Sequence, residues 1–230
     1  MEQEGRVERR LSRATLLRRA GVVGVAAAVP TGALVAEAAQ PPQRERLESL
    51  TATEADALDA MLDRLIPTDA SGPGAGEARV LRYVDRALDG ELRADRPRYA
   101  AGLAALDDYA RSRFGSRFAD LAAAQQDTIL RELEQNAAPG FAGGSRAFFE
   151  LVREHALQGM FGDPYHGGNA DFIGWDLLGF TGIRMVYTEA EQQLDVAVVP
   201  AHKSAVDYPL WSGARGSANG ANGGEHHGHA

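Results

Sequence analysis

The chain has 230 residues, a formal net charge of −8 at pH 7 and no cysteine. The absence of cysteine excludes disulfides, thiolate nucleophiles, cysteine-ligated zinc and iron–sulfur clusters. The acidic balance disfavours nucleic acid as a partner, because the phosphate backbone attracts basic surfaces. A composition rich in Ala and Leu, with few β-branched runs, favours an all-helical domain.

Changes in composition divide the chain into four parts. We expect an export signal at residues 1–38, a polar linker with prolines at 39–50, a helical domain at 51–211 and a disordered Gly- and His-rich tail at 212–230. The domain is long enough to bury a core without metal or disulfide crosslinks. We therefore predict one irregular all-α domain of about five main helices with a long ordered loop, flanked by the signal and the tail.

The first 38 residues have the pattern of a secretory signal. A basic stretch at 6–19 precedes an uncharged run of Ala, Gly, Val and Leu, and the small residues Ala36 and Ala38 stand where signal peptidase requires them. The stretch also resembles a twin-arginine signal, although Ala14 stands where the second Arg of that consensus belongs. The residues that carry this prediction are Arg9, Arg10, Arg13, Leu16 and Leu17. An ordinary signal peptide and an uncleaved membrane anchor are the alternatives.

Four segments of the domain show apolar residues at helical spacing before residue 145. They span residues 51–66, 77–88, 97–114 and 122–135. Thr51 and Glu54 form the pattern of a capping box at the start of the first segment, and Pro67 ends it. Loops are predicted between the segments, and Ser145 is predicted to cap a fifth helix.

The most informative stretch is residues 148–182. Apolar residues recur at three- and four-residue steps as far as Met160, which predicts an amphipathic helix with His155 on its apolar face. Pro164 and the Gly-Gly-Asn run at 167–169 then specify a tight loop. Large apolar residues follow, interrupted by glycines, and we expect a short helix or extended segment packed against the body.

After residue 182 the pattern weakens. We expect residues 185–187 and 196–199 to form short extended pieces. Residues 208–211 are expected to form a terminal segment that lies on the domain surface or on a partner.

The loop and the residues behind it resemble the signature of a known family. Gly-Met-Phe-Gly-Asp-Pro-Tyr-His-Gly-Gly-Asn at 159–169, followed by Gly-Trp at 174–175 and Gly-Phe at 179–180, is similar to the gluconate 2-dehydrogenase subunit 3 family. The joint spacing of these pairs is specific, whereas each pair alone is a weak signal. One departure is His166, which stands where this family often has Tyr.

The resemblance extends over most of residues 51–182, because Ile66-Pro67 and Pro73-Gly74-Ala75 also match the family's N-terminal half. It implies a non-catalytic small subunit without its own cofactor, and we expect no metal site. The implied partner is an FAD-dependent dehydrogenase subunit of the glucose-methanol-choline class, which oxidises a sugar, sugar acid or polyol and often passes electrons to a c-type cytochrome subunit. The small subunit would stabilise this flavoprotein and carry it through the twin-arginine translocon to the periplasm or the outer face of the cytoplasmic membrane.

The signature residues are expected to serve as a partner interface, as a structural staple, or as both. Aromatic and amide groups on a fixed loop can form an interface hot spot, but the same groups can fill the domain's own core. The residues are Phe161, Gly162, Asp163, Pro164, Tyr165, His166, Gly167, Gly168, Asn169, Gly174, Trp175, Gly179 and Phe180.

Two other functions stay open at the level of sequence. Asp163, His166 and Asp171 lie close enough in the chain to hold a divalent ion. The protein would then be a small metal-dependent enzyme. Alternatively, Asp163 accepts hydrogen bonds from loop amides. A free-standing sugar-binding module is the other option. The sequence has no GxSxG motif and no GxGxxG motif after a strand, so it predicts neither a serine hydrolase nor a flavin site.

Overall fold

The structure is a computed structural model, and it describes residues 46–194 and 196–211. This part of the chain contains six α-helices and no β-strand, which confirms the predicted all-α class. None of the helices within the described ranges is both long and apolar enough to cross a membrane. The predicted signal and tail lie outside the described residues, and with them Arg9, Arg10, Arg13, Leu16, Leu17, Ala36 and Ala38.

Helix α2 (Ala52–Leu65) begins with the predicted capping box. The Thr51 hydroxyl accepts a hydrogen bond from the Glu54 N–H at 3.3 Å, and the Glu54 carboxylate accepts from the Thr51 N–H at 2.8 Å. These reciprocal bonds satisfy two backbone donors that the first turn of a helix leaves without partners. The apolar positions of this helix are Leu58, Met61 and Leu62, and all three are fully buried.

Helix α3 (Val80–Asp89) begins three residues later than predicted. The reason is Arg79, whose φ of 55° is left-handed and interrupts the helical backbone. Helix α4 (Arg96–Phe114) carries Pro97 in its first turn, where the missing N–H costs nothing, and ends at Gly115 with a φ of 80°. Its Tyr99, Leu103 and Leu106 are buried as expected, whereas Tyr109 is half-buried.

Helices α5 (Ala123–Glu134) and α6 (Ser145–Phe161) pack against each other. The prediction that Ser145 caps α6 is wrong, because Gly144 is the N-cap and Ser145 is the first helical residue. Its buried hydroxyl donates to the Leu133 carbonyl of α5 instead, at 3.3 Å. The side chain of Asn136 supplies an acceptor for the α6 N-terminus, since its Oδ1 accepts from the Arg146 N–H at 3.2 Å.

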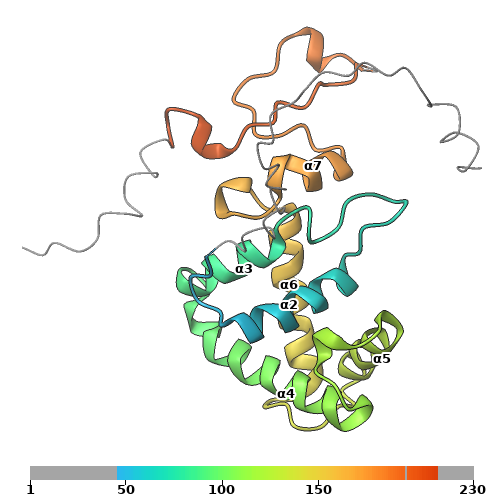
Figure 1. Cartoon of the computed structure of the whole chain (residues 1–230). Helices are drawn as coiled ribbons and strands as arrows, with labels where there is room; N and C mark the ends of the chain where they lie inside the picture. The colour runs from blue at the N-terminus through green and yellow to red at the C-terminus, as the bar shows by residue number, and fades with distance from the viewer. Residues whose placement is uncertain (1–45, 195, 212–230) are drawn as a thin grey trace, which may run out of the picture. The chain divides into compact units, whose positions relative to one another are not determined.

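Helix α6 is the centre of the packing. It contacts α2, α3, α4, α5 and α7, and Figure 1 shows it extending from the α4 and α5 end of the helical body to α7. Its buried face includes Phe148, Val152, Ala156 and Met160, which join one hydrophobic core with the apolar faces of α2 to α5. The C-terminal end of α6 is therefore held rigidly by the core, and the loop that follows it begins from a fixed position.

A buried carboxylate on α3 holds the segment that precedes α2. Asp85 accepts hydrogen bonds from three consecutive backbone N–H groups, those of Glu48, Ser49 and Leu50, at 2.6, 3.0 and 2.8 Å. Sequence reasoning assigned these residues to the linker and did not single out Asp85. The structure instead fixes residues 48–50 against α3.

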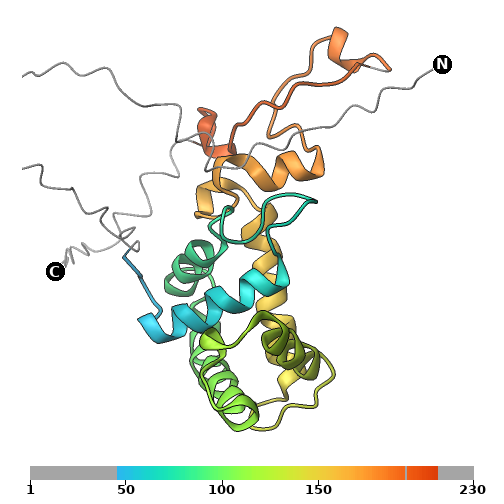
Figure 2. The ribbon, with the colours of Figure 1, turned by 45° about the vertical axis from the view of Figure 1, so that its right-hand side comes forward.

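Beyond α6 the chain forms α7 (Ile173–Leu178) and then a long segment without α-helix or strand. We call residues 181–211 the arm. Figure 2 shows its orange and red chain running out from α7 and back. Two backbone hydrogen bonds join the outgoing and returning parts of the arm near α7. The N–H of Ala201 donates to the Thr181 carbonyl at 2.9 Å, and the N–H of Ile183 donates to the Lys203 carbonyl at 3.3 Å. The predicted extended pieces form no strand within the described part of the arm.

Candidate functional site

The signature loop begins where α6 ends. Gly162 caps α6, and the Asp163 carboxylate folds back on the loop to accept the Tyr165 N–H at 3.0 Å. Its second oxygen accepts the N–H of Ala205, in the arm, at 2.9 Å. Asp163 therefore binds amides, as one of the two sequence interpretations proposed, and it joins the loop to the arm.

Asn169 is the internal support of the loop. Its side chain is completely buried and links two backbone groups. Nδ2 donates to the Gly162 carbonyl at 2.8 Å, and Oδ1 accepts the Gly174 N–H at 2.8 Å. The Asn169 N–H also donates to the Gly159 carbonyl at 2.7 Å. Because a buried polar group without a partner is costly, this set of bonds fixes the loop and α7 on the end of α6.

Two glycines allow the chain to approach α6 closely. A Cβ placed on Gly168 would lie 2.2 Å from the Gly159 carbonyl oxygen, and one on Gly174 would lie 1.9 Å from that of Met160. These distances are too short for any side chain, and the obstacle in both cases is helix backbone. Gly168 and Gly174 are therefore points at which the chain approaches the α6 backbone closely.

Trp175 anchors α7 rather than a partner. Its indole is 5% exposed, and Nε1 donates to the Phe161 carbonyl at 2.8 Å. Its ring lies 5.4 Å from that of Phe172 and 4.9 Å from that of Phe180. Phe172 in turn stacks on His202 of the arm at 5.2 Å. The aromatic residues therefore form a row that connects the loop, α7 and the arm.

The backbone beneath this row is strained. Asn169, Asp171 and Phe172 have φ values of 44°, 54° and 65°, so three of four consecutive residues are left-handed without being glycine. Asn tolerates this region, whereas a bulky aromatic residue rarely adopts it. Such strain persists where the surrounding contacts over-determine the conformation, and here Asn169 and Trp175 provide those contacts.

The structure divides the signature residues by exposure. Those that are buried are Gly168, Asn169, Gly174 and Trp175. Those of intermediate exposure are Phe161, Gly162, Asp163, Pro164, Tyr165 and Gly167. Those that are exposed are His166, Gly179 and Phe180. Of the two roles considered for the signature residues, Asn169 has the structural one, because its amide completes backbone hydrogen bonds inside the loop.

The three residues considered for a metal site do not form one. Among the described residues, no group of three or more His, Asp or Glu side chains is placed to hold a metal ion. Asp163 is occupied by two amides, and His166 lies 3.8 Å from Glu91 of the α3–α4 connection. His155 is a core residue as predicted, since it is buried and its Nδ1 lies 3.0 Å from the Tyr99 hydroxyl.

The feature that sequence reasoning missed is an exposed apolar surface on α7 and the arm. Twelve large apolar side chains are exposed in the described part of the chain, and one of them, Leu157, lies on α6. The other eleven, which we call the apolar surface, are Leu177, Leu178, Phe180, Met185, Val186, Tyr187, Leu194, Val196, Val199, Leu210 and Trp211. The expectation that residues 172–180 are packed against the body therefore holds for Trp175, whereas Leu177, Leu178 and Phe180 remain 44%, 62% and 41% exposed.

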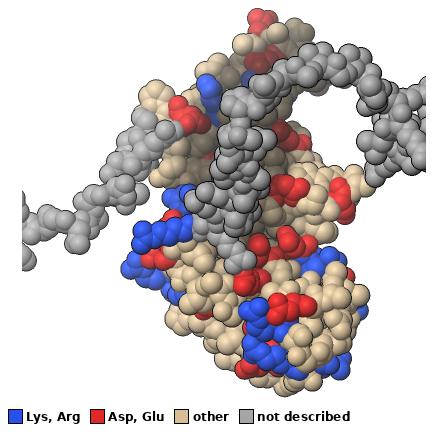
Figure 3. Space-filling model, in the orientation of Figure 1, with Lys and Arg blue, Asp and Glu red and all other residues tan. Residues whose placement is uncertain are grey.

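Basic side chains are distributed differently. On the face drawn in Figure 3, most Lys and Arg atoms lie low in the view, over the helical body, and few lie near α7 and the arm. The sequence agrees, because Arg184 and Lys203 are the two Lys or Arg residues between Glu154 and Ala214. The arm is thus apolar and locally poor in positive charge.

The family described as Gluconate 2-dehydrogenase subunit 3 matches residues 52–182, which is more than half of the chain. The chain belongs to this family. No curated protein and no solved structure matches it. As a gluconate 2-dehydrogenase subunit 3, the chain has an accessory role in a dehydrogenase complex. The subunit 3 match covers the helices, the loop and α7, and it ends before most of the arm.

Proposed function

We propose that this subunit 3 chain binds an FAD-dependent dehydrogenase subunit of the glucose-methanol-choline class, stabilises it and accompanies it through the twin-arginine translocon. The chain itself carries no active site and holds no FAD. The complex oxidises a sugar, sugar acid or polyol outside the cytoplasm and passes electrons to a c-type cytochrome subunit. Family membership and the signal-like sequence of residues 1–38 support this assignment.

The observation that carries the proposal is the apolar surface. Single exposed apolar residues are common on monomeric proteins, but eleven large ones within residues 177–211 indicate an interaction site. Leu194 is 92% exposed and Val186 78% exposed, and both belong to a stretch with no α-helix or strand of its own in the described residues. Burying five such side chains contributes about 10 kcal/mol before the entropy costs of association. Those costs are of similar size, about 4–15 kcal/mol, so a stable complex would bury more than five of the eleven side chains.

The loop and aromatic row support the same conclusion. A docking surface binds more tightly when its conformation is fixed before the partner arrives. Asn169, Asp163 and the Phe172–His202 stack connect the arm and α7 to the rigid end of α6. The signature residues thus act as the scaffold of the interface, and the apolar surface makes the contact.

The proposal is tested by co-expressing the full chain with the flavoprotein subunit and measuring complex formation, FAD content and export. The double variant Leu178→Ser/Leu194→Ser should bind about a hundredfold more weakly, because two large apolar groups no longer become buried. Leu157→Ser is the matched control, since Leu157 is exposed on α6 outside the apolar surface. A flavoprotein that is stable, active and exported without this chain would contradict the proposal.

The same preparation tests the two other functions considered from the sequence. Elemental analysis of the purified chain should find no stoichiometric metal. Calorimetric titration with gluconate should give no binding heat. Stoichiometric metal or saturable gluconate binding would favour an enzyme or a sugar-binding module instead.

A further inference from the structure

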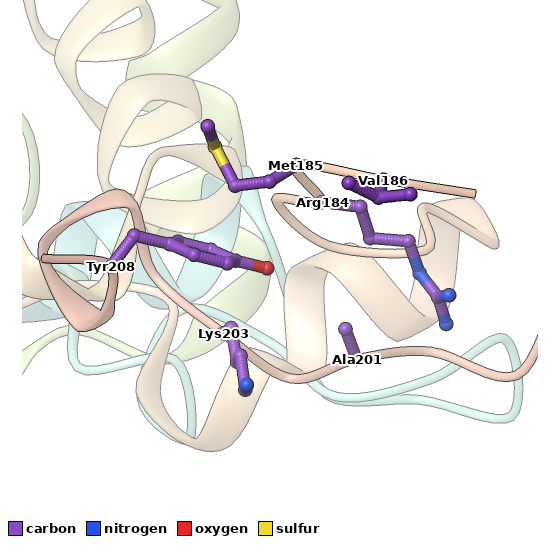
Figure 4. Close-up of a pocket in the computed structure, with 6 residues that line it drawn as sticks. All are labelled: Arg184, Met185, Val186, Ala201, Lys203 and Tyr208. Atoms are coloured by element: carbon purple, nitrogen blue, oxygen red, sulfur yellow. The ribbon is translucent and has the colours of Figure 1, made fainter. Parts of the chain in front are cut away.

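The arm contains a hollow that is lined by both of its cationic side chains. It measures about 410 Å³, and its walls are Arg184, Met185, Val186, Ala201, Lys203 and Tyr208. Figure 4 shows these residues, which come from the outgoing and returning parts of the arm. The hollow lies beyond the residues that match the subunit 3 family, so family membership assigns it no role.

The stretch around the hollow is otherwise acidic. Between Glu154 and Ala214 the sequence has seven Asp or Glu residues, against Arg184 and Lys203 as the two Lys or Arg residues. Both cations line the same hollow, where Arg184 also pairs with Glu191, so the hollow is the least negative point of an acidic stretch.

Arg184 is held in place and keeps one donor unused. Its Nη1 donates to Glu191 at 2.7 Å, and its Nη2 donates to the Val199 carbonyl. Its Nε is buried and has no acceptor among the described residues. A buried N–H without an acceptor costs about 1–3 kcal/mol, so an incoming anion that accepts this bond would be favoured.

Lys203 supplies the second charge. Its ammonium lies 5.5 Å from the centre of the Tyr208 ring, and no carboxylate of the described residues forms an ion pair with it. The Tyr208 ring is fixed, since its hydroxyl donates to the Ile183 carbonyl at 2.6 Å. The ammonium is thus positioned by an aromatic face while its hydrogen-bond donors stay available to a ligand.

The remaining walls are apolar. Met185, Val186 and Ala201 provide a surface that suits methylene or methyl groups rather than a second charge. We infer that this hollow is a carboxylate-binding pocket, in which the flavoprotein subunit places the carboxylate of an acidic side chain or of its C-terminus between Arg184 and Lys203. This inference rests on the proposed function and adds a charged point of specificity to an apolar interface.

Lys203 makes the inference directly testable, because it is the single lysine of the 230-residue sequence. The one other primary amine of the chain is its N-terminal α-amino group. A carbodiimide condenses an adjacent carboxylate and amine to an amide and is itself converted to a urea. Carbodiimide treatment of the co-purified complex, followed by mass spectrometry, should join Lys203 to a carboxylate of the flavoprotein. The crosslinked peptide identifies a side-chain or a C-terminal carboxylate.

Binding measurements with charge variants complete the test. Lys203→Met should weaken the complex about tenfold, the effect of losing one charge-assisted hydrogen bond, and Lys203→Arg should retain most of the affinity. Arg153→Met is the matched control, since Arg153 is an exposed cation on α6 that pairs with Glu150. Amine acylation of Lys203 should be slower in the complex than in the free chain.

The outcomes separate this pocket from the proposed function. If the wild-type chain and the flavoprotein do not associate, both proposals fail. If they associate while Lys203 forms no crosslink to the flavoprotein and Lys203→Met binds as tightly as the wild type, the pocket proposal alone is overturned. A crosslink from Lys203 to a second copy of this chain would also overturn it.

Discussion

Replacing Asn169 with alanine should detach the signature loop and α7 from α6. The substitution removes the acceptor of the buried Gly174 N–H and the donor to the half-buried Gly162 carbonyl. Leaving the first group unpaired costs about 2 kcal/mol and the second about 1 kcal/mol. Alanine at a φ of 44° adds about 1 kcal/mol of strain that asparagine tolerates better. The expected loss of folding stability is therefore about 4 kcal/mol.

Asn136→Ala is the matched control for this change. Asn136 has a φ of 59°, so alanine meets similar strain there, but its side chain accepts one hydrogen bond, from the Arg146 N–H, at an exposed position where water can replace it. We expect a loss of about 1 kcal/mol for the control. The difference of about 3 kcal/mol corresponds to roughly 10 °C in the unfolding midpoint for a domain of this size.

Circular dichroism melting curves of the full chain and its two variants measure this difference. Hydrogen exchange at the Gly174 amide should be fast in Asn169→Ala and protected in Asn136→Ala, which separates local detachment from general loss of stability. Equal melting temperatures for the two variants, with Gly174 still protected, would show that the bridge does not support the loop. The signature residues would then not act as a scaffold.

Gly174→Ala should prevent stable folding of α7, since the added methyl group would clash with the α6 backbone. Gly179→Ala should cost about 1 kcal/mol of folding stability, because Gly179 has a positive φ but open space around it. Melting curves distinguish the two variants. Burial lowers the pKa of His155, so the unfolded chain takes up its proton at higher pH than the folded chain. Stability should be complete above about pH 6.5 and decline below it, and His155→Gln should flatten that decline in melting curves recorded across pH 4–8. Asp85→Asn should expose the amides of residues 48–50 to fast hydrogen exchange, because its NH₂ group opposes their N–H groups; unchanged protection would refute this role.

The helical body was largely predictable from the sequence because apolar spacing and capping residues are local signals. Thr51 and Glu54 cap α2 as expected, and the buried positions of α4 and α6 follow the predicted faces. The errors lie where the start of a helix depends on contacts or backbone conformations that the local sequence pattern does not show. Ser145 follows the N-cap because its hydroxyl bonds to α5, and α3 starts late because Arg79 is left-handed.

The site was predictable in part. Its glycines and Asn169 are recognisable as turn residues, and Asp163 as a binder of amides. The apolar surface was not predictable, because the sequence does not distinguish apolar residues that fill the chain's own core from apolar residues that contact a partner. Leu178 and Phe180 are as apolar as the residues of α6, but the chain has no element that covers them within the described residues.

The apolar surface also bears on the fate of the chain in the cell. A subunit made in excess of its partner would present eleven large apolar groups to water and to other chains, which favours aggregation and recognition by chaperones and proteases. The abundance of this protein should therefore follow the supply of its partner, with the surplus removed as an orphan subunit.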